Sequence, residues 1–391
     1  MLRYLSADYI FPVSSEPVKD GIVVLNDAGE IIDLLDPMLS SKIPATVEYN
    51  RGILVPGFVN SHCHLELSHL HGKISKGTGL VSFIKAVMSQ RATDQEEILS
   101  AMILNDQLMF ENGIVAVGDI SNNLLSGSVK QNSSMYYHTF VELLGFDPEK
   151  AEMVFNKALK LKSDFAPLPA SIVPHAPYSV SEKLFGLLHE YSEIHENLSS
   201  IHNQESQAET DLFMNKSGEF LDFYRMMNLD LNFFNARYQS SIQSILPLFS
   251  VRQKTLLVHN TYTSPEDLAT IAASGMNINY CFCPNANLYI EGRLPDIEMF
   301  LNKNFKITIG TDSLASNDKL CILSELKVIK EYFPELTFSQ TIRWATLYGA
   351  QFLGIDKRFG SIEKGKTPGL NLIENVEGPE LTSNSTIRKL I

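Results

Sequence analysis

The sequence predicts an α/β protein built around a (β/α)8 barrel, with a smaller β-rich region at the two ends of the chain. Eight short apolar β runs alternate with amphipathic helical stretches over roughly 300 residues, which is the element order of such a barrel. No Gly-x-Gly-x-x-Gly follows the first strand, and this disfavours the alternative of a doubly wound open sheet.

The two ends of the chain carry turn and strand signals. Residues 1–50 are β-rich, and within them residues 21–32 contain two apolar runs separated by an Asn-Asp-Ala-Gly turn, which is typical of a hairpin. Residues 359–373 again alternate turn and strand signals. These two end segments could pair into one small sheet domain.

The middle of the chain supplies the strands and helices of the expected barrel. The expected strands are residues 53–59, 114–119, 135–143, 170–174, 198–202, 255–259, 277–280 and 307–310. Expected helices between them include residues 94–112, 181–194, 265–274 and 320–331. Residues 203–250 form a long insert after the fifth strand, and inserts of this kind cover the active-site face of a barrel.

Composition limits the classes of partner. The net charge of −13 makes a nucleic-acid backbone an unfavourable ligand, and no apolar run reaches the ~18 residues of a membrane span. The first residues lack the layout of a secretory signal, and four cysteines make no disulfide framework in 391 residues, so we expect a cytoplasmic protein. Cys281 and Cys283 are expected to be buried small side chains rather than a metal clip.

The first expected barrel strand leads into a His-x-His pair. Because side chains alternate along a strand, His62 and His64 point the same way and Cys63 points the other way. Two imidazoles side by side make half of a divalent metal site. Taken alone, the pair is equally consistent with polar residues at a strand exit.

Further histidines and an aspartate follow the ends of later strands. The fourth strand leads to His175, the fifth to His202, the sixth to His259 and the eighth to Asp312. The carboxyl ends of barrel strands converge on one mouth, so ligands can come from distant positions. Packing does not call for imidazole at each mouth position, and we therefore expect a shared metal site.

Three motifs resemble the amidohydrolase superfamily, in its deaminase and chlorohydrolase branch. The segment Gly57-Phe58-Val59-Asn60-Ser61-His62-Cys63-His64 resembles the first-strand motif, and His202-x-x-Glu205 resembles the fifth-strand motif. The segment from Gly310 to Asn317, Gly-Thr-Asp-Ser-x-Ala-Ser-Asn, resembles the eighth-strand motif. The resemblance implies a distorted TIM barrel at residues 52–355 and a β-sandwich made of residues 1–51 and 356–391.

The resemblance also implies roles for the matching residues. His62, His64, His202 and Asp312 would bind one divalent metal, Zn²⁺ in the first instance with Fe²⁺ or Mn²⁺ as alternatives. Binuclear branches carry a lysine on the fourth strand, and residues 170–178 contain none, which indicates one metal.

Catalytic and substrate-binding roles follow from the same resemblance. A bound metal would make hydroxide available at neutral pH, with Asp312 taking the proton and Glu205 shuttling protons to the ring nitrogen and the leaving ammonia. His259 would orient the water or polarise the developing tetrahedral centre. His175, Asn285 and Asn287 are the expected substrate-binding residues, with a loop cap as the alternative for the asparagines.

The segments 64–68, 173–178 and 283–289 resemble aminofutalosine deaminase-like hydrolases, and less completely the deaminases of adenosylhomocysteine and methylthioadenosine. The resemblance therefore implies hydrolytic deamination of an adenine-type nucleoside, a small-molecule substrate. Chloride or cyclic-amide hydrolysis is the alternative reaction, and an inactive barrel that serves as a binding module is the alternative class. A homodimer is compatible with the sequence, which does not fix the oligomeric state.

Overall fold

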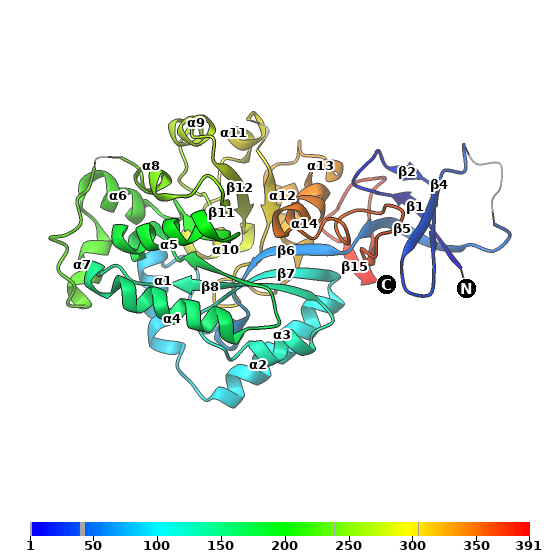
Figure 1. The fold of residues 1–391 in the computed structure, drawn as a ribbon. Coiled ribbons are helices and arrows are strands. Elements are labelled where there is room, and N and C mark those ends of the chain that lie inside the picture. Colours follow the sequence, from blue (N-terminus) through cyan, green and yellow to red (C-terminus); the bar gives the residue numbers. More distant parts are fainter. Residues whose placement is uncertain (1, 40–43, 238, 304) are drawn as a thin grey trace.

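The computed structural model describes residues 2–39, 44–237, 239–303 and 305–391, which contain two four-stranded parallel sheets and one seven-stranded mixed sheet (Figure 1). The first parallel sheet has the order β6 (Phe58–Cys63), β7 (Ile114–Ser121), β8 (Tyr136–Leu143), β9 (Ala170–Pro174). The second has the order β10 (Leu198–Asn203), β11 (Lys254–His259), β12 (Asn277–Phe282), β13 (Ile307–Ile309). All eight residues of β7 are buried, as expected for a parallel strand covered on both faces.

Backbone hydrogen bonds connect the two parallel sheets at two places. Past β9, the carbonyl of His175 accepts a hydrogen bond from the backbone N–H of His202 on β10, at 2.9 Å. On the other side, Thr311 and Asp312 donate their backbone N–H groups to the carbonyl of His62 on β6, at 3.0 and 3.1 Å. The ends of β13 and β6 therefore lie side by side.

Helices follow most of these strands and pack outside the sheets (Figure 1). The longer ones are α1 (Leu80–Gln90), α2 (Gln95–Glu111), α4 (Ala151–Asp164), α5 (Glu182–Ile194), α9 (Pro265–Ala273) and α12 (Ile322–Tyr332). Shorter ones are α3 (Gly127–Asn132), α10 (Pro284–Glu291), α11 (Ile297–Leu301), α13 (Phe338–Trp344) and α14 (Leu347–Leu353). Side-chain caps set several starts, since Asp94, Ser181 and Ser264 each accept a backbone N–H of the first turn.

The insert after β10 folds into α6 (Gln207–Asn215), α7 (Glu219–Met226) and α8 (Ser241–Ile245). Helix α7 contacts α1, and its Phe220 and Tyr224 stack on Tyr178 and Phe146, with ring centroids 4.4 and 5.0 Å apart. Aromatic pairs of this kind stabilise the insert where it crosses the carboxyl ends of the strands.

The seven-stranded sheet joins the two ends of the chain in a separate lobe that contains both termini (Figure 1). Its strands are β1 (Arg3–Ile10), β2 (Val18–Lys19), β3 (Ile22–Leu25), β4 (Ile31–Leu35), β5 (Glu48–Pro56), β14 (Leu370–Glu374) and β15 (Thr386–Lys389). Strands β3 and β4 form the expected antiparallel hairpin. Strand β14 pairs antiparallel with β5, with Leu372 opposite Leu54.

The expected first barrel strand at residues 53–59 is wrong as a single strand. Strand β5 ends at Pro56 in the terminal sheet, and β6 begins at Phe58 in a parallel sheet. Gly57 lies between them, where a Cβ atom would meet Val115 Cγ1 at 2.3 Å and the Pro368 carbonyl oxygen at 2.6 Å. Only glycine allows the chain to pass so close to both neighbours.

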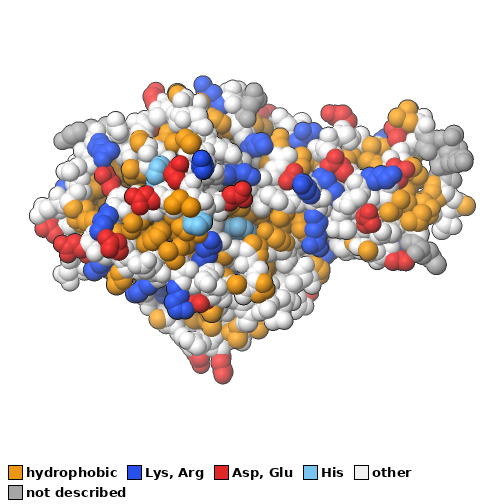
Figure 2. All heavy atoms as spheres, in the orientation of Figure 1, with side chains coloured by type: hydrophobic (Ala, Val, Ile, Leu, Met, Phe, Trp, Pro, Cys, Tyr) orange, Lys and Arg blue, Asp and Glu red, His pale blue; other side chains and the backbone are white. Residues whose placement is uncertain are grey.

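Two observations bear on a membrane and a nucleic acid as partners. No helix in the described part of the chain combines the length and the apolar character needed to cross a lipid bilayer. On the face drawn in Figure 2, the lysine and arginine side chains are interspersed with carboxylates rather than gathered into one patch. Cys281 and Cys283 are buried and free, as expected, and so are Cys63 and Cys321.

Candidate active site

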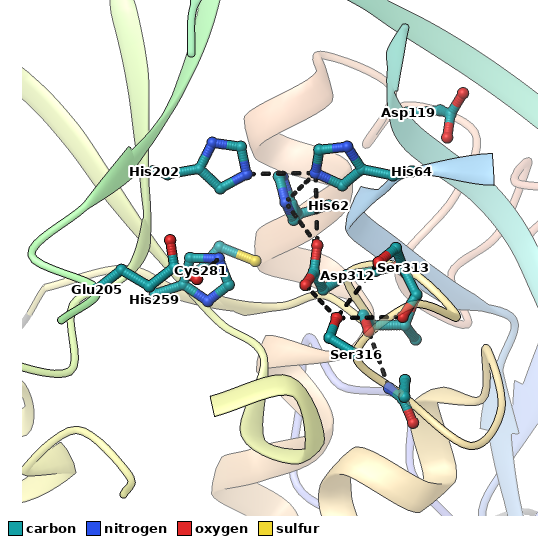
Figure 3. Close-up of polar contacts among 12 residues, drawn as sticks. His62, His64, Asp119, His202, Glu205, His259, Cys281, Asp312, Ser313 and Ser316 are labelled. Carbon is teal, nitrogen blue, oxygen red and sulfur yellow. Dashed lines mark hydrogen bonds and ion pairs between the residues drawn. The ribbon is translucent and has the colours of Figure 1, made fainter. Parts of the chain in front are cut away.

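Four side chains from three strand ends converge at the carboxyl edge of the parallel sheets (Figure 3). The Nε2 atom of His64 lies 3.1 Å from Nε2 of His62 and 3.2 Å from Nε2 of His202. Asp312 Oδ1 lies 3.4 Å from His64 Nε2 and 3.6 Å from His62 Nε2. These are the four residues that the sequence predicts as metal ligands.

The separations between these atoms fit one small cation. Ligands at ~2.0–2.1 Å around a tetrahedral centre lie about 3.4 Å from one another. The four distances between the ligand atoms, 3.1–3.6 Å, bracket that value. Two imidazole nitrogens at this distance can share at most one proton, so three of them cannot all be paired with one another. Lone pairs therefore remain unpaired and face a common point. The donor set therefore suits a divalent metal.

The eighth strand end reaches the histidines because of local features of its sequence. A Cβ atom on Gly310 would lie 2.8 Å from His62 Cβ and 2.9 Å from Cys281 Sγ, so only glycine lets β13 approach β6. Asp312 has a left-handed backbone, with φ 55°. Its Oδ2 accepts a 2.5 Å hydrogen bond from Ser316 Oγ, which leaves Oδ1 facing the imidazoles.

Contacts behind the ligands fix their orientation. His202 donates its Nδ1–H to the His175 carbonyl at 2.8 Å, so its Nε2 lone pair faces the site. The backbone N–H of Leu65, next to His64, donates to Asp119 Oδ1 at 2.8 Å. Asp119 is paired with Lys130 at 2.7 Å, and both side chains are fully buried. This ion pair lies behind the first-strand ligands.

Burial keeps three of the imidazoles at the site, those of His64, His202 and His259, neutral at neutral pH. It lowers the pKa of His64 to about 3 and the pKa of His259 to about 4, and it holds the pKa of His202 well below the usual range. Burial alone would raise the pKa of Asp312, but the hydrogen bond with His62 and the neighbouring imidazoles outweigh it and lower that pKa. His64 and His202 thus present neutral nitrogens and Asp312 a carboxylate, the protonation states that a metal requires of these ligands.

Glu205 and His259 lie together beside the four ligands (Figure 3). His259 Nε2 is 3.6 Å from Glu205 Oε1, and its Nδ1 is 2.9 Å from Asn287 Oδ1. Burial, followed by the charges of Asp312 and Glu209, raises the pKa of Glu205 well above its usual value. His259 has φ 72°, a strained backbone of the kind that collects at functional sites.

A cavity of about 360 Å³ opens onto this group. Its inner end is lined by His64, His202, Glu205, His259 and Asp312. Its outer wall is mostly apolar, with residues from α1 and α7, and this part of the insert covers the mouth as expected. Apolar walls with a few polar groups are typical of a small-molecule site.

The structure brings together some of the expected substrate-binding residues and leaves others aside. His175 lines the cavity, whereas Asn285 and Asn287 are not among the residues that line it. Asn287 instead accepts from His259 and donates to Thr261 at 3.0 Å. Glu142 also lines the cavity and was missed, although it stands near the carboxyl end of the third barrel strand, β8.

A family model described as "Amidohydrolase family" matches residues 53–390. An adenosine deaminase from Helicobacter pylori is 26% identical over 363 residues, with 89% of this chain and 87% of the relative covered. An aminodeoxyfutalosine deaminase from Nitratiruptor is 28% identical, with 92% of this chain and 89% of the relative covered.

Solved structures give the same fold. A crystal structure of Helicobacter pylori aminofutalosine deaminase in complex with methylthio-coformycin superimposes with a TM-score of 0.78 at 25% identity, covering 97% of this chain and 93% of that one. An adenosine deaminase from Xanthomonas campestris with bound zinc gives a TM-score of 0.74 at 21% identity, covering 95% of this chain and 84% of that one.

Proposed function

We propose, since the chain belongs to the amidohydrolase family, that it removes the amino group of an adenine-type nucleoside by hydrolysis at a single divalent metal. The observation that carries this proposal is the convergence of three imidazole nitrogens and one carboxylate oxygen beside Glu205 and His259, at the inner end of a cavity. The deaminase relatives from Helicobacter pylori and Nitratiruptor support the choice of reaction.

The proposed metal is Zn²⁺, held by His62, His64, His202 and Asp312. Three imidazoles and one carboxylate suit zinc, and the related adenosine deaminase structure contains it. Fe²⁺ and Mn²⁺ accept the same donors and remain the alternatives. When bound, such an ion lowers the pKa of a water molecule to about 7 and so supplies a nucleophile at neutral pH.

Asp312 is the proposed acceptor of the first proton. Its lowered pKa keeps it ionised at neutral pH, and the bond from Ser316 holds Oδ2 while Oδ1 faces the histidines. A proton released by water at this place can therefore pass to the carboxylate. The oxygen of that water forms the new bond to the ring carbon that carries the amino group.

Glu205 is the proposed proton donor. With its pKa raised well above the usual value, its carboxyl group stays protonated at neutral pH and can donate to the adjacent ring nitrogen. The same group can then carry the proton from Asp312 to the departing amine. The amino group leaves as ammonia, the ring keeps the oxygen of water, and the second proton of that water returns to Glu205 and restores its protonated state.

His259 is proposed to orient the water. Because Asn287 uses its amide N–H to reach Thr261, its Oδ1 accepts from His259, and we assign the proton to Nδ1 of His259. Its Nε2 then carries a lone pair that can accept a hydrogen bond from water. Asn287 acts through His259 in this account, and a substrate contact for Asn285, which does not line the cavity, stays a prediction.

The finer architecture belongs to the same proposal. Hydrogen bonds join His175, just past β9, to β10, and they join Thr311 and Asp312, just past β13, to β6. They support a distorted TIM barrel that closes through both sheets. Residues 1–51 and 356–391 are proposed as the β-sandwich and residues 52–355 as the barrel, although β5 continues past this boundary to Pro56. A homodimer and a cytoplasmic location stay predictions.

An ammonia-coupled assay tests the proposed reaction. Protein purified without chelators should contain close to one equivalent of metal and release ammonia from at least one of adenosine, methylthioadenosine, adenosylhomocysteine and aminofutalosine. Metal-loaded protein that releases none would contradict deamination and favour another leaving group. Less than about half an equivalent of metal would favour an inactive binding module.

A further inference from the structure

Resting on the proposed function, we propose that Glu142 on β8 recognises the sugar of the nucleoside, by accepting a hydrogen bond from a ribose hydroxyl. One carboxylate oxygen of Glu142, Oε2, accepts from Asn122 Nδ2 at 2.8 Å. The other, Oε1, is buried and has no hydrogen-bond partner among the described residues. The side chain is only 3% exposed, yet it lines the cavity.

An unpaired, buried carboxylate oxygen is unfavourable, and native proteins keep such groups where a ligand or water completes them. Nearby histidines do not complete Glu142. His202 Nδ1 lies 3.9 Å from Oε1, beyond hydrogen-bond distance, and gives its proton to the His175 carbonyl at 2.8 Å. His175 uses its Nδ1 with Ser179 at 2.6 Å.

The position of Glu142 matches a sugar rather than the reacting ring. His202 lies between the two regions, since its Nε2 faces His64 at 3.2 Å and its Nδ1 side faces Glu142. Glu142 therefore lies across one imidazole ring from the nitrogen that faces the metal site. In an adenine nucleoside the sugar is attached to the five-membered ring, on the far side from the amino-bearing carbon. Its hydroxyls would reach this depth when that carbon lies beside Asp312.

The surroundings make Glu142 a point of specificity. Beyond it the cavity wall is formed by apolar side chains that include Phe83 and Val87 of α1 and Phe223 of α7. The guanidinium of Arg91, which also lines this wall, contacts Glu66 at 3.4 Å and Asn122 at 3.3 Å. A few fixed polar groups in an apolar cavity orient a ligand and reject analogues that leave those groups unpaired.

The test compares nucleosides that differ only in sugar hydroxyls. For wild type we expect kcat/KM for 2′-deoxyadenosine or 3′-deoxyadenosine, whichever lacks the hydroxyl that meets Glu142, to be roughly ten- to a hundredfold below that for adenosine. In Glu142→Ala this ratio should fall below about threefold because the acceptor is gone. Glu142→Gln keeps an acceptor oxygen and should retain part of the discrimination.

Asp106→Asn provides the matched control, because Asp106 is a carboxylate that accepts from Tyr137 at the opposite end of the same strand, at 2.7 Å. Its nucleoside ratio should equal that of wild type. Equal loss of kcat/KM for all three nucleosides in Glu142→Ala would overturn the inference, because it would mean that Glu142 only supports His202.

Metal analysis tests whether Glu142 binds a second cation instead of a sugar. Glu142, His175 and His202 also lie close enough to one another to hold one. Loss of a second metal equivalent in Glu142→Gln would overturn the sugar assignment. If wild type released ammonia from none of adenosine, methylthioadenosine, adenosylhomocysteine and aminofutalosine, the proposed function and this inference would both be overturned. Release with unchanged ratios in Glu142→Ala would overturn this inference alone.

Discussion

Replacing Lys130 by methionine should destabilise the protein and weaken metal binding together. The ammonium of Lys130 lies 2.7 Å from Asp119 Oδ2, and neither side chain is exposed. Lys130 also donates to Ser121 at 2.8 Å and to Thr139 at 3.1 Å. Removing it leaves the Asp119 carboxylate buried without its counter-charge, and breaking such a pair costs about 3–5 kcal/mol.

The effect on the metal follows from the other oxygen of Asp119. That oxygen accepts the backbone N–H of Leu65, directly after His64. An unpaired Asp119 would shift or take up a proton, and His64 would lose its fixed position. Groups behind metal ligands typically contribute about 10- to 100-fold in affinity, so we expect zinc to bind Lys130→Met that much more weakly.

A double variant separates charge from packing. In Lys130→Met with Asp119→Asn, the amide oxygen can still accept from Leu65 while no buried charge remains. The double variant should regain most of the stability and zinc affinity that Lys130→Met loses, as measured by urea unfolding and competitive zinc titration. A loss below about 1 kcal/mol in Lys130→Met, or a double variant no better than the single one, would refute this reasoning.

Three further changes test separate parts of the account. Glu205→Gln should keep its metal but lower kcat roughly 10²-fold or more, whereas Glu182→Gln, at an exposed position, should leave kcat unchanged. Near-normal ammonia release by Glu205→Gln would remove Glu205 from the mechanism. Gly310→Ala should lower the free energy of unfolding by about 1–3 kcal/mol and reduce zinc content, because its Cβ would crowd the first-strand ligands. Gly186→Ala, with open space around the added Cβ, should be neutral or slightly stabilising. Equal unfolding curves for the two variants would contradict the close approach at Gly310. Burial, with a smaller effect from two lysines, lowers the pKa of His138 from 6.5 to about 4, so its contribution to stability is present above pH ~6.5 and is lost as pH falls toward 4. As pH falls from ~7 to ~5, the free energy of unfolding of His138→Gln, measured in urea, should therefore decrease by about 2 kcal/mol less than that of wild type. Parallel profiles of that free energy against pH for the two proteins would be evidence against the lowered pKa.

The candidate ligands could be found in the sequence because of one geometric rule. Parallel strands bring their carboxyl ends to one edge, so residues after the first, fifth, sixth and eighth strands had to meet if the strands were placed correctly. His62 and His64 share a face through the two-residue period of a strand. The structure brings together His62, His64, His202 and Asp312 on this basis.

Other features depend on contacts that no local pattern specifies. The break at Gly57 arises because Val115 and Pro368, far along the chain, lie against it. Asp119 and Glu142 are carboxylates within apolar strands, and only their partners, Lys130 and Asn122, tell one role from the other. A check for polar residues at the second and third strand ends would have marked both for attention.

The apolar outer wall was also beyond sequence reasoning in detail. The insert was expected to cover the mouth, but its mixture of aromatic and polar residues does not say which face points inward. Packing of α7 against α1 decides that Phe223 lines the cavity while Arg225 stays at the surface with Asp222. Tertiary contact, rather than helical periodicity alone, selects the face in so short a helix.

The central claim is that one metal ion at the His62, His64, His202 and Asp312 site supports deamination. The most direct measurement is the rate of ammonia release from an adenine nucleoside while metal-free protein is titrated with zinc. The account predicts a rate that rises linearly to one equivalent and then stays constant, and no such rise in Asp312→Ala. Full activity without metal, or a rate that reaches its maximum only at two equivalents, would contradict it.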